Sequence, residues 1–83
     1  MYKVRIEKEV KKKLHQISEP YFSKIQNAIL KLADNPRPKG YKKLLDRKAY
    51  RVRVGVYRII YEIHDDILLV DIIRIGHRKE IYN

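Results

Sequence analysis

Residues 50–59 alternate apolar and basic side chains, with an interruption near the middle at Gly55-Val56. A period of two is typical of a half-buried β-strand, and two such runs joined by a two-residue turn predict a β-hairpin. Counting outward from the turn predicts that Arg53 faces Arg58. One face of the hairpin is then apolar, and the opposite face carries Arg51, Arg53 and Arg58.

The other periodicities predict three more elements. Residues 2–6 alternate apolar and basic residues, as in a short strand. From about Glu7 the apolar residues recur at helical spacing, and Ser18 is placed to cap a second helix that ends before Asn35. Residues 67–75 predict a long final strand.

The predicted order is β-α-α-β-β-β, which describes one α+β domain over residues 1–83. We expect an antiparallel sheet with an N-terminal helical hairpin packed on one face. Hydrophobic residues make up 45% of the sequence, which is enough for a core and too much for a disordered basic tail. A chain of 83 residues has a modest core, so a large enclosed active site is not expected.

The charge of the chain is strongly basic. It has 20 Lys and Arg against 10 Asp and Glu, a formal net charge of +10. Such a charge density favours a polyanionic partner, either nucleic acid or an acidic protein. Residues 36–40 are rich in proline and glycine and predict a connector, followed by a basic loop. In that loop the candidate RNA-binding residues are Lys42, Lys43, Arg47 and Lys48.

The facing arginines suggest a function. Like charges directly opposite each other destabilise a sheet, so Arg53 across from Arg58 favours a phosphate cradle. The alternative, for any one of these arginines, is an ordinary solvated residue. After the last strand, Arg78 could join Arg51, Arg53 and Arg58.

The C-terminal run also carries candidate functional groups. Tyr82 could stack on an RNA base, with a core-edge anchor or a frayed terminus as the alternative. His77 and Glu80 are candidates for proton transfer, and solvated polar residues are the alternative.

Metal and cofactor chemistry are not expected. The chain has no cysteine, and His15 and His64 lack metal-ligand spacing to a carboxylate pair. No stretch is long enough to span a membrane and no signal peptide is present, so we expect a cytoplasmic protein without a membrane partner.

Residues 50–61, followed after a strand by residues 76–82, resemble the RelE/ParE superfamily of toxins from type II toxin–antitoxin pairs. The predicted order of elements matches that family along the whole chain. For the RelE branch the resemblance implies a ribosome-dependent mRNA endoribonuclease. It enters the ribosomal A site and cleaves without a metal, through attack of the nucleotide's own 2′-OH on the adjacent phosphate. The implied partners are a cognate antitoxin, the ribosome and mRNA.

The resemblance also implies which residues act in catalysis. Five positions match the basic and aromatic positions of the family motif, namely Arg51, Arg53, Arg58, Arg78 and Tyr82. Well-known members carry lysine where this chain has Arg51 and Arg53. Arginine stays protonated, so the general base is unassigned.

Three alternatives stay open. A ParE-like toxin would inhibit DNA gyrase through protein contacts, although that branch generally lacks the arginine and C-terminal tyrosine set. A basic RNA-binding module would hold phosphates with the same arginines and cut nothing. A degraded toxin would retain only antitoxin binding. Codon preference and the stoichiometry of the toxin–antitoxin complex are not predicted by the sequence.

Overall fold

A computed structural model describes residues 1–77 and 79 of the protein. Its helices and strands follow the order expected from the sequence, with one additional short strand and one 3₁₀ turn. The elements are β1 Lys3–Ile6, α1 Lys8–His15, α2 Tyr21–Asp34, β2 Lys42–Lys43, β3 Tyr50–Val54, β4 Tyr57–His64, η1 Asp65–Ile67 and β5 Leu69–His77.

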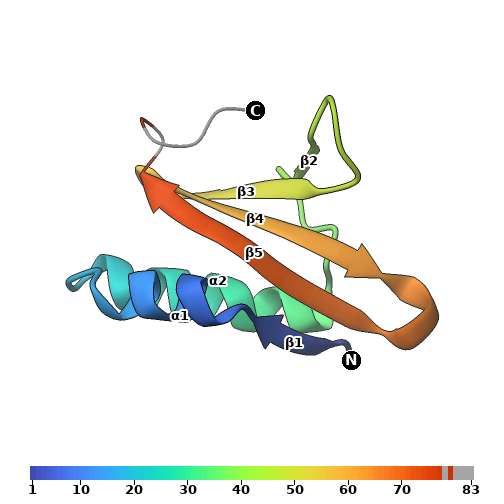
Figure 1. The fold of residues 1–83 in the computed structure, drawn as a ribbon, viewed down its shortest axis with the longest axis horizontal. Coiled ribbons are helices and arrows are strands. Elements are labelled where there is room, and N and C mark those ends of the chain that lie inside the picture. Colours follow the sequence, from blue (N-terminus) through green and yellow to red (C-terminus); the bar gives the residue numbers. More distant parts are fainter. Residues whose placement is uncertain (78, 80–83) are drawn as a thin grey trace.

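The five strands form one sheet in the order β1-β5-β4-β3-β2 (Figure 1). Strand β1 pairs with β5 in parallel, and the other neighbours are antiparallel. The prediction of a purely antiparallel sheet is therefore wrong: the sheet is mixed. The alternation of residues in β1 fixes which face is buried but not which strand it pairs with, and β1 lies at an edge beside the last strand.

Two local predictions also need correction. The segment expected to be a basic loop contains β2, which pairs with the start of β3. Strand β5 begins at Leu69 and not at Ile67, because a 3₁₀ turn over Asp65–Ile67 precedes it and Leu68 adopts a left-handed conformation with φ of 51°. Short 3₁₀ turns of this kind are common connectors and leave little trace in hydrophobic periodicity.

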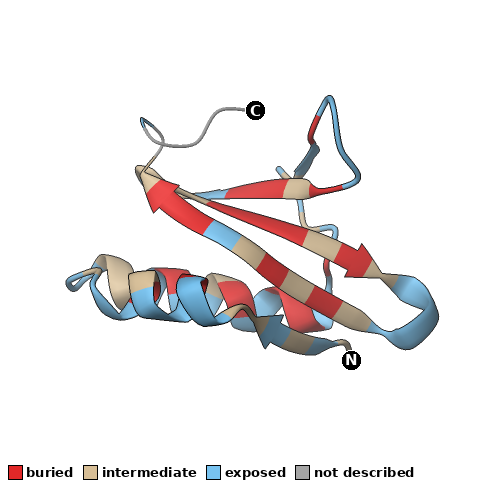
Figure 2. Cartoon of the chain, viewed as in Figure 1, coloured by how far each residue is buried: buried red, intermediate tan, exposed pale blue. Residues whose placement is uncertain are grey.

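Both helices lie on the same side of the sheet (Figure 1). The core between the helices and the sheet is apolar. Figure 2 shows buried residues along β3, β4 and β5. The fully buried side chains of this core include Ile25, Leu32, Ile59, Tyr61, Val70 and Ile72. Burying side chains of this size stabilises the fold by about 1.5–3 kcal/mol each. The Tyr61 hydroxyl donates a hydrogen bond of 2.7 Å to the carbonyl oxygen of Pro36, so this buried polar group is satisfied.

The start of α2 differs from the sequence prediction. Ser18 makes no side-chain cap, and the helix begins at Tyr21 after Pro20. The carboxylate of Glu19 instead accepts hydrogen bonds from the backbone N–H of Ser23 at 3.0 Å and from its hydroxyl at 2.8 Å. A carboxylate there satisfies one of the free N–H groups of the first helical turn and is favoured by the helix dipole.

A polar contact ties the β4–β5 turn to the connector after α2. Arg37 forms an ion pair of 2.8 Å with Asp65, and the Tyr2 hydroxyl also donates a hydrogen bond to Asp65. The hydrogen bond from Arg37, reinforced by the one from Tyr2, lowers the pKa of the Asp65 carboxyl to about 2. The hydrogen bond that the Tyr2 hydroxyl donates to the Asp65 carboxylate raises the pKa of Tyr2.

The sheet face opposite the helices is termed the open face. A second, smaller apolar cluster lies on it, formed by Leu44, Ala49 and Ile60 with Ile73 packed against them. The loop after β2 closes over this cluster, since the backbone N–H of Leu44 donates to the carbonyl of Ala49 at 2.9 Å. None of the helices in the described part of the chain is long and apolar enough to cross a membrane.

Candidate nucleic-acid interface

The β3–β4 hairpin places three arginines on the open face. Its register pairs Arg53 with Arg58 and Arg51 with Ile60, as the count from the Gly55-Val56 turn predicts. The intervening residues, such as Val52, pack in the core on the helix side. Arg51, Arg53 and Arg58 are together termed the arginine cluster.

Within this cluster Arg51 is buried, with only 3% of its surface exposed. It lies between Lys42 on β2 and Ile60 on β4, and it makes no ion pair with any described residue. Its Nε is also without a hydrogen-bond partner among the described residues. Burial lowers the pKa of Arg51, and the nearby charges of Arg53 and Arg58 lower it further.

A buried guanidinium beside other cations is costly unless an anion compensates it. At the turn of the hairpin there is room for an anion beside two of the three arginines, Arg53 and Arg58, although Arg51 does not line this space. A hollow of about 130 Å³ is lined by Arg53, Gly55, Tyr57 and Arg58. Because one water molecule occupies about 30 Å³ in the liquid, this space can take a phosphate group. Chemically, the arginine cluster can bind and neutralise a phosphodiester through several charge-assisted hydrogen bonds.

Arg74 adds a fourth arginine to the open face that the sequence prediction missed. It pairs with Ile60, whose other neighbour is Arg51, and it is exposed. An irregularity in the β4–β5 ladder inserts Ile73 as an extra residue and thereby sets the direction of Arg74. The signal in the sequence is Ile72-Ile73, two adjacent isoleucines that break the alternation.

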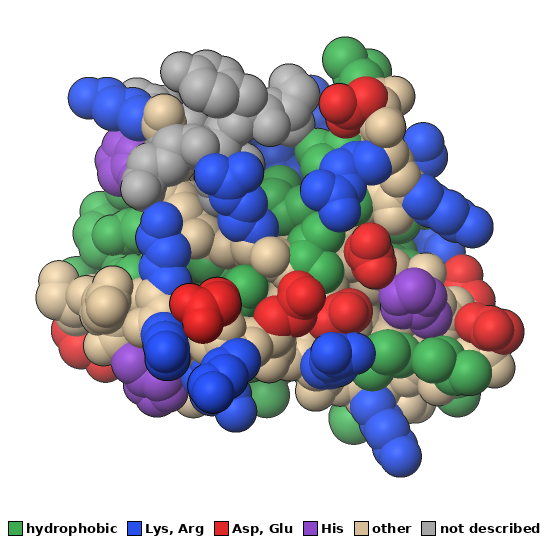
Figure 3. All heavy atoms as spheres, viewed as in Figure 1, with side chains coloured by type: hydrophobic (Ala, Val, Ile, Leu, Met, Phe, Trp, Pro, Cys, Tyr) green, Lys and Arg blue, Asp and Glu red, His purple; other side chains and the backbone are tan. Residues whose placement is uncertain are grey.

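The structure separates the four basic residues predicted in the loop. Lys42 lies opposite Arg51 and so shares its face, whereas Lys43 pairs with Tyr50, whose side chain packs against the helix-side core. Arg47 and Lys48 are exposed in the β2–β3 loop, and Arg47 forms an ion pair of 3.8 Å with Glu62. Of these four, Lys42 adjoins the arginine cluster. Lys and Arg side chains are spread over the face of the molecule that Figure 3 shows.

The predicted C-terminal site residues fall into two groups. Arg78, Glu80 and Tyr82 lie outside the described residues. His77 is described and pairs with Tyr57, with the two rings edge to face at 5.9 Å between centroids. Because Tyr57 packs against the helix-side core, His77 lies on that side of the sheet and not with the arginine cluster.

A possible cation site lies at the far end of the open face. Glu62, His64 and Asp71 have ligand atoms within 4.8 Å of one another. The prediction that His64 stands apart from carboxylates is therefore wrong, since its Nε2 is 3.3 Å from Glu62. This set could hold a divalent cation, but Glu62 already contacts both His64 and Arg47. These contacts account for the grouping without a metal.

The sequence matches the family described as the ParE toxin of type II toxin–antitoxin systems over residues 2–82. No curated protein matches the chain. Among solved structures, the chain is 26% identical to a chain of the RelE–RelB complex from Pyrococcus horikoshii, with a TM-score of 0.84 and coverage of 96% of this chain and 98% of that one.

Two further solved structures have the same sequence identity to this chain as the Pyrococcus horikoshii complex. The RelBE2 toxin–antitoxin complex from Mycobacterium tuberculosis contains a chain with 26% identity, a TM-score of 0.81 and coverage of 93% of this chain and 98% of that one. The RelB–RelE complex from Methanococcus jannaschii gives 26% identity, a TM-score of 0.75 and 95% coverage of both chains. The fold described above is thus the fold found in RelE toxins.

Proposed function

This chain belongs to the ParE toxin family of type II toxin–antitoxin systems, within the RelE/ParE superfamily, and from that premise we propose that it is an mRNA endoribonuclease that acts on the ribosome. The observation that carries the proposal is the arginine cluster. Three guanidinium groups share one sheet face, and one of them is buried without an acidic partner among the described residues. Such a site is better suited to binding a phosphodiester than to contacting another protein, because its positive charges are held in place before the substrate arrives.

The proposed reaction is attack of the nucleotide's own 2′-OH on the adjacent phosphate. The 5′-oxygen of the next nucleotide leaves as the new bond forms. Negative charge accumulates on the phosphorane, and arginine side chains stabilise it through fixed hydrogen-bond donors. Arg51, Arg53 and Arg58 hold and neutralise the phosphate, while Arg78 stabilises the leaving oxygen and Tyr82 stacks on a base. The positive charge comes from the protein, so the proposal requires no metal.

Proton transfer falls to groups outside the arginine cluster. Arginine stays protonated at any working pH, so it does not act readily as a general base. The candidates from the sequence are His77 and Glu80. His77 packs against Tyr57 on the helix side, which separates it from the cluster. The ribosome or the substrate itself is a further source of a base in this proposal.

The proposed partners follow from the same site. The ribosome presents mRNA to the arginine cluster, which places this activity in the cytoplasm. The three similar structures described above are toxin–antitoxin complexes, two of RelE with RelB and one of RelBE2. By analogy we propose a cognate antitoxin, acidic or amphipathic, that offsets the net charge of +10 on this chain.

The test is to add the purified protein to a translating extract and to map the new RNA ends. Cuts at A-site codons are expected with the wild type. The double variant Arg78→Ala/Tyr82→Ala is expected to lose cleavage and to keep the fold, with Lys11→Ala, on the exposed side of α1, as the matched control. Full cleavage by the double variant would contradict the assignment of these two residues.

A second candidate function is inhibition of DNA gyrase, because the matching family is named for ParE. A supercoiling assay run in parallel distinguishes it. Loss of supercoiling without new RNA ends favours gyrase. RNA binding without cleavage or gyrase inhibition favours a non-catalytic module.

A further inference from the structure

Arg74 lies in the part of β5 that extends past the end of β1. Strand β1 pairs with β5 only as far as Ile6 and Ile72, so no described strand borders Arg74 on that side. Its partner on the other side is Ile60 of β4. The extra residue Ile73 turns Arg74 onto the open face, where it is exposed. Arg74 thus lies at the point where the open face meets a free edge of the sheet.

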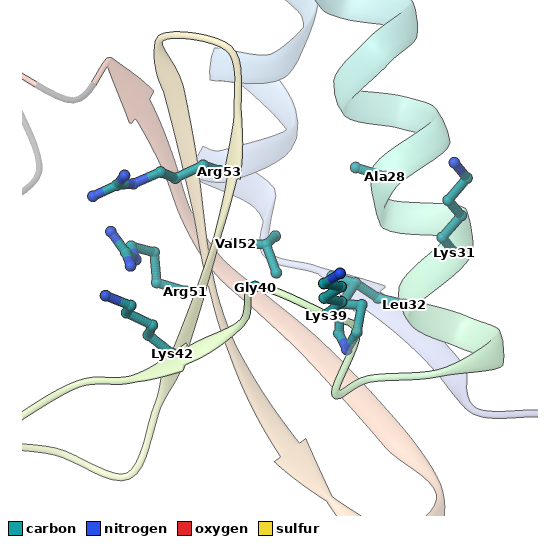
Figure 4. A pocket seen from close by; sticks show the side chains of 10 residues that line it. Ala28, Lys31, Leu32, Lys39, Gly40, Lys42, Arg51, Val52 and Arg53 are labelled. Atoms are coloured by element: carbon teal, nitrogen blue, oxygen red, sulfur yellow. The ribbon is translucent and has the colours of Figure 1, made fainter.

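The open face carries a row of cations across the sheet at the level of Arg74. The strand pairings place four residues side by side on β2, β3, β4 and β5, namely Lys42, Arg51, Ile60 and Arg74. In Figure 4 the side chains of Lys42, Arg51 and Arg53 all point away from α2. Neighbouring strands are about 4.8 Å apart, so the backbone at Arg74 is roughly 10 Å from the backbone at Arg51. The basic region of the open face therefore extends past β4 to the edge of the sheet.

A second hollow, of about 200 Å³, lies between α1 and β5 beside Arg74. Its two basic lining residues are Lys13 and Arg74, and it shares no residue with the hollow of about 130 Å³ at the hairpin turn. Glu9 is the one acidic residue among the described residues that line it, and Glu9 forms an ion pair of 3.8 Å with Lys12. Each hollow is lined by two cations and is larger than several water molecules, so each can take an anion of its own.

Acidic residues limit the basic region on the side away from the hairpin turn. Glu62 faces Asp71 across β4 and β5, two residues further from the turn than Ile60. A phosphate would be repelled by this pair and attracted by the arginines on the other side. The favourable path for a polyanion on the open face therefore runs across the strands, from β3 to β5, and not along them.

We propose that Arg74 and Lys13 form a second phosphate subsite, which a single-stranded RNA reaches by crossing β4 and β5 from the arginine cluster. The identity of the polyanion as RNA rests on the function proposed above. The scissile phosphate stays at the arginine cluster, and another phosphate of the same strand lies between Arg74 and Lys13. The guanidinium fork of Arg74 fits a phosphate and binds it through charge-assisted hydrogen bonds. The rest of the hollow offers an apolar surface to the adjoining ribose or base, formed by Val10, Ile73 and Ile75.

In this proposal Arg74 binds the substrate away from the bond that breaks. An interaction that is equally strong with the bound substrate and with the transition state lowers KM and leaves kcat unchanged. Arg74→Gln is therefore expected to raise KM for cleavage and to retain kcat. Arg53→Gln, which removes a contact to the scissile phosphate, should lower kcat.

The test measures the binding of fluorescein-labelled 2′-O-methyl RNA by anisotropy. This RNA lacks the attacking 2′-OH, so the proposed reaction cannot cleave it during the measurement. A dinucleotide has one phosphodiester and reports on the arginine cluster alone, whereas a hexanucleotide is long enough to reach Arg74 as well. Arg74→Gln is expected to weaken binding of the hexanucleotide about tenfold and to leave binding of the dinucleotide unchanged. For the hexanucleotide, the slope of log affinity against log salt should become shallower by about 0.7.

Arg5→Gln is the matched control. Arg5 is exposed, and its neighbours Val4 and Ile6 pack against the helix-side core, so Arg5 lies on the open face. It pairs with Asp71, beyond the acidic limit of the proposed path. The substitution removes the same charge and should change the affinity by less than about twofold, because exposed charges away from the RNA are screened. Equal losses in Arg5→Gln and Arg74→Gln would overturn the proposal in favour of a diffuse attraction by the net charge of +10.

Neutral linkages in the RNA locate the two phosphates. A methylphosphonate replaces one phosphate of the hexanucleotide at a time. One replacement should weaken binding to the wild type but not to Arg74→Gln, and a different one should behave in this way with Arg53→Gln. The same linkage for both variants would overturn the second subsite, and so would equal affinity of the wild type and Arg74→Gln for the hexanucleotide. Absence of cleavage in the translating extract, with this binding pattern intact, would overturn only the proposed nuclease function.

Discussion

Arg53 lies directly opposite Arg58 across the β3–β4 hairpin, so two positive charges face each other on the open face of the sheet. Like charges in this position destabilise a sheet by about 0.2–1 kcal/mol. The pairing of Arg53 with Arg58 by itself lowers the stability of the sheet. Under the function proposed above, a phosphate between the two groups would turn this repulsion into attraction.

Arg53→Gln is therefore expected to make the protein more stable and less active. Removing the repulsion should raise the free energy of unfolding by about 0.2–1 kcal/mol at low salt. The gain should shrink as salt is added, because exposed charges are screened over about 10 Å at 0.1 M. Urea unfolding at low and high salt measures the gain in stability, and an RNA-binding assay measures the loss of function. Lys11→Gln controls for the loss of one charge; a destabilised Arg53→Gln would contradict the role of repulsion.

Substitutions of Arg51 separate the effect on stability from the effect on function more clearly than Arg53→Gln does. The Arg51 side chain is buried and unpaired among the described residues. A buried charge without an ionic partner carries a desolvation penalty that an apolar side chain of similar length does not have. Arg51→Met is therefore expected to unfold at the same or a higher urea concentration and to lose RNA cleavage. Arg51→Ala should lose cleavage too, with lower stability from the cavity it leaves. Marked destabilisation of Arg51→Met would mean that Arg51 serves the fold and not the ligand.

Much of the hairpin could be predicted from sequence, because the residues that determine its register lie close together in the sequence. The alternation of residues and a glycine-containing turn set both the register and the faces, and the observed pairing of Arg53 with Arg58 agrees with the prediction. The burial of Arg51 could not be predicted. It depends on Lys42 of β2 and on the loop that packs over Ile60, which are contacts between segments distant in sequence from one another.

The parallel pairing of β1 with β5 shows the same limit. Lys3 pairs with Leu69, and nothing in either segment specifies that partner. The extra residue in β5 was visible as Ile72-Ile73 in the sequence, yet its effect, to turn Arg74 onto the open face, depends on the ladder with β4. Periodicity thus predicts which residues share a face within one strand, whereas assembly of the sheet decides which strands combine their faces into a site.

The ion pair of Asp65 with Arg37 predicts a change of stability with pH. The folded-state pKa of Asp65, about 2, lies below the ordinary value of 3.8. Asp65 therefore contributes stability that is fully present above about pH 4 and is lost as the pH falls towards 2. Asp65→Asn is expected to be less stable than the wild type at pH 7, with a difference that shrinks below about pH 4 and vanishes only when the pH falls below about 2. Urea unfolding across this range measures it, with the exposed neighbour Asp66→Asn as control; a difference that does not depend on pH would contradict the assignment.

Gly55 holds the turn that makes Arg53 face Arg58, and its replacement tests how tightly that turn is fixed. Its φ is +60°, and a Cβ there would lie 3.0 Å from Cε1 of Tyr21 at the start of α2. Gly55→Ala should thus cost about 1–2 kcal/mol in backbone strain and about 1–3 kcal/mol more from crowding against a ring. Gly40→Ala is the matched control, because Gly40 also has a positive φ, of +92°, but a Cβ there meets no atom within 4 Å. Chemical denaturation should rank Gly55→Ala clearly below Gly40→Ala; equal losses would show that Tyr21 yields and that strain alone fixes the turn.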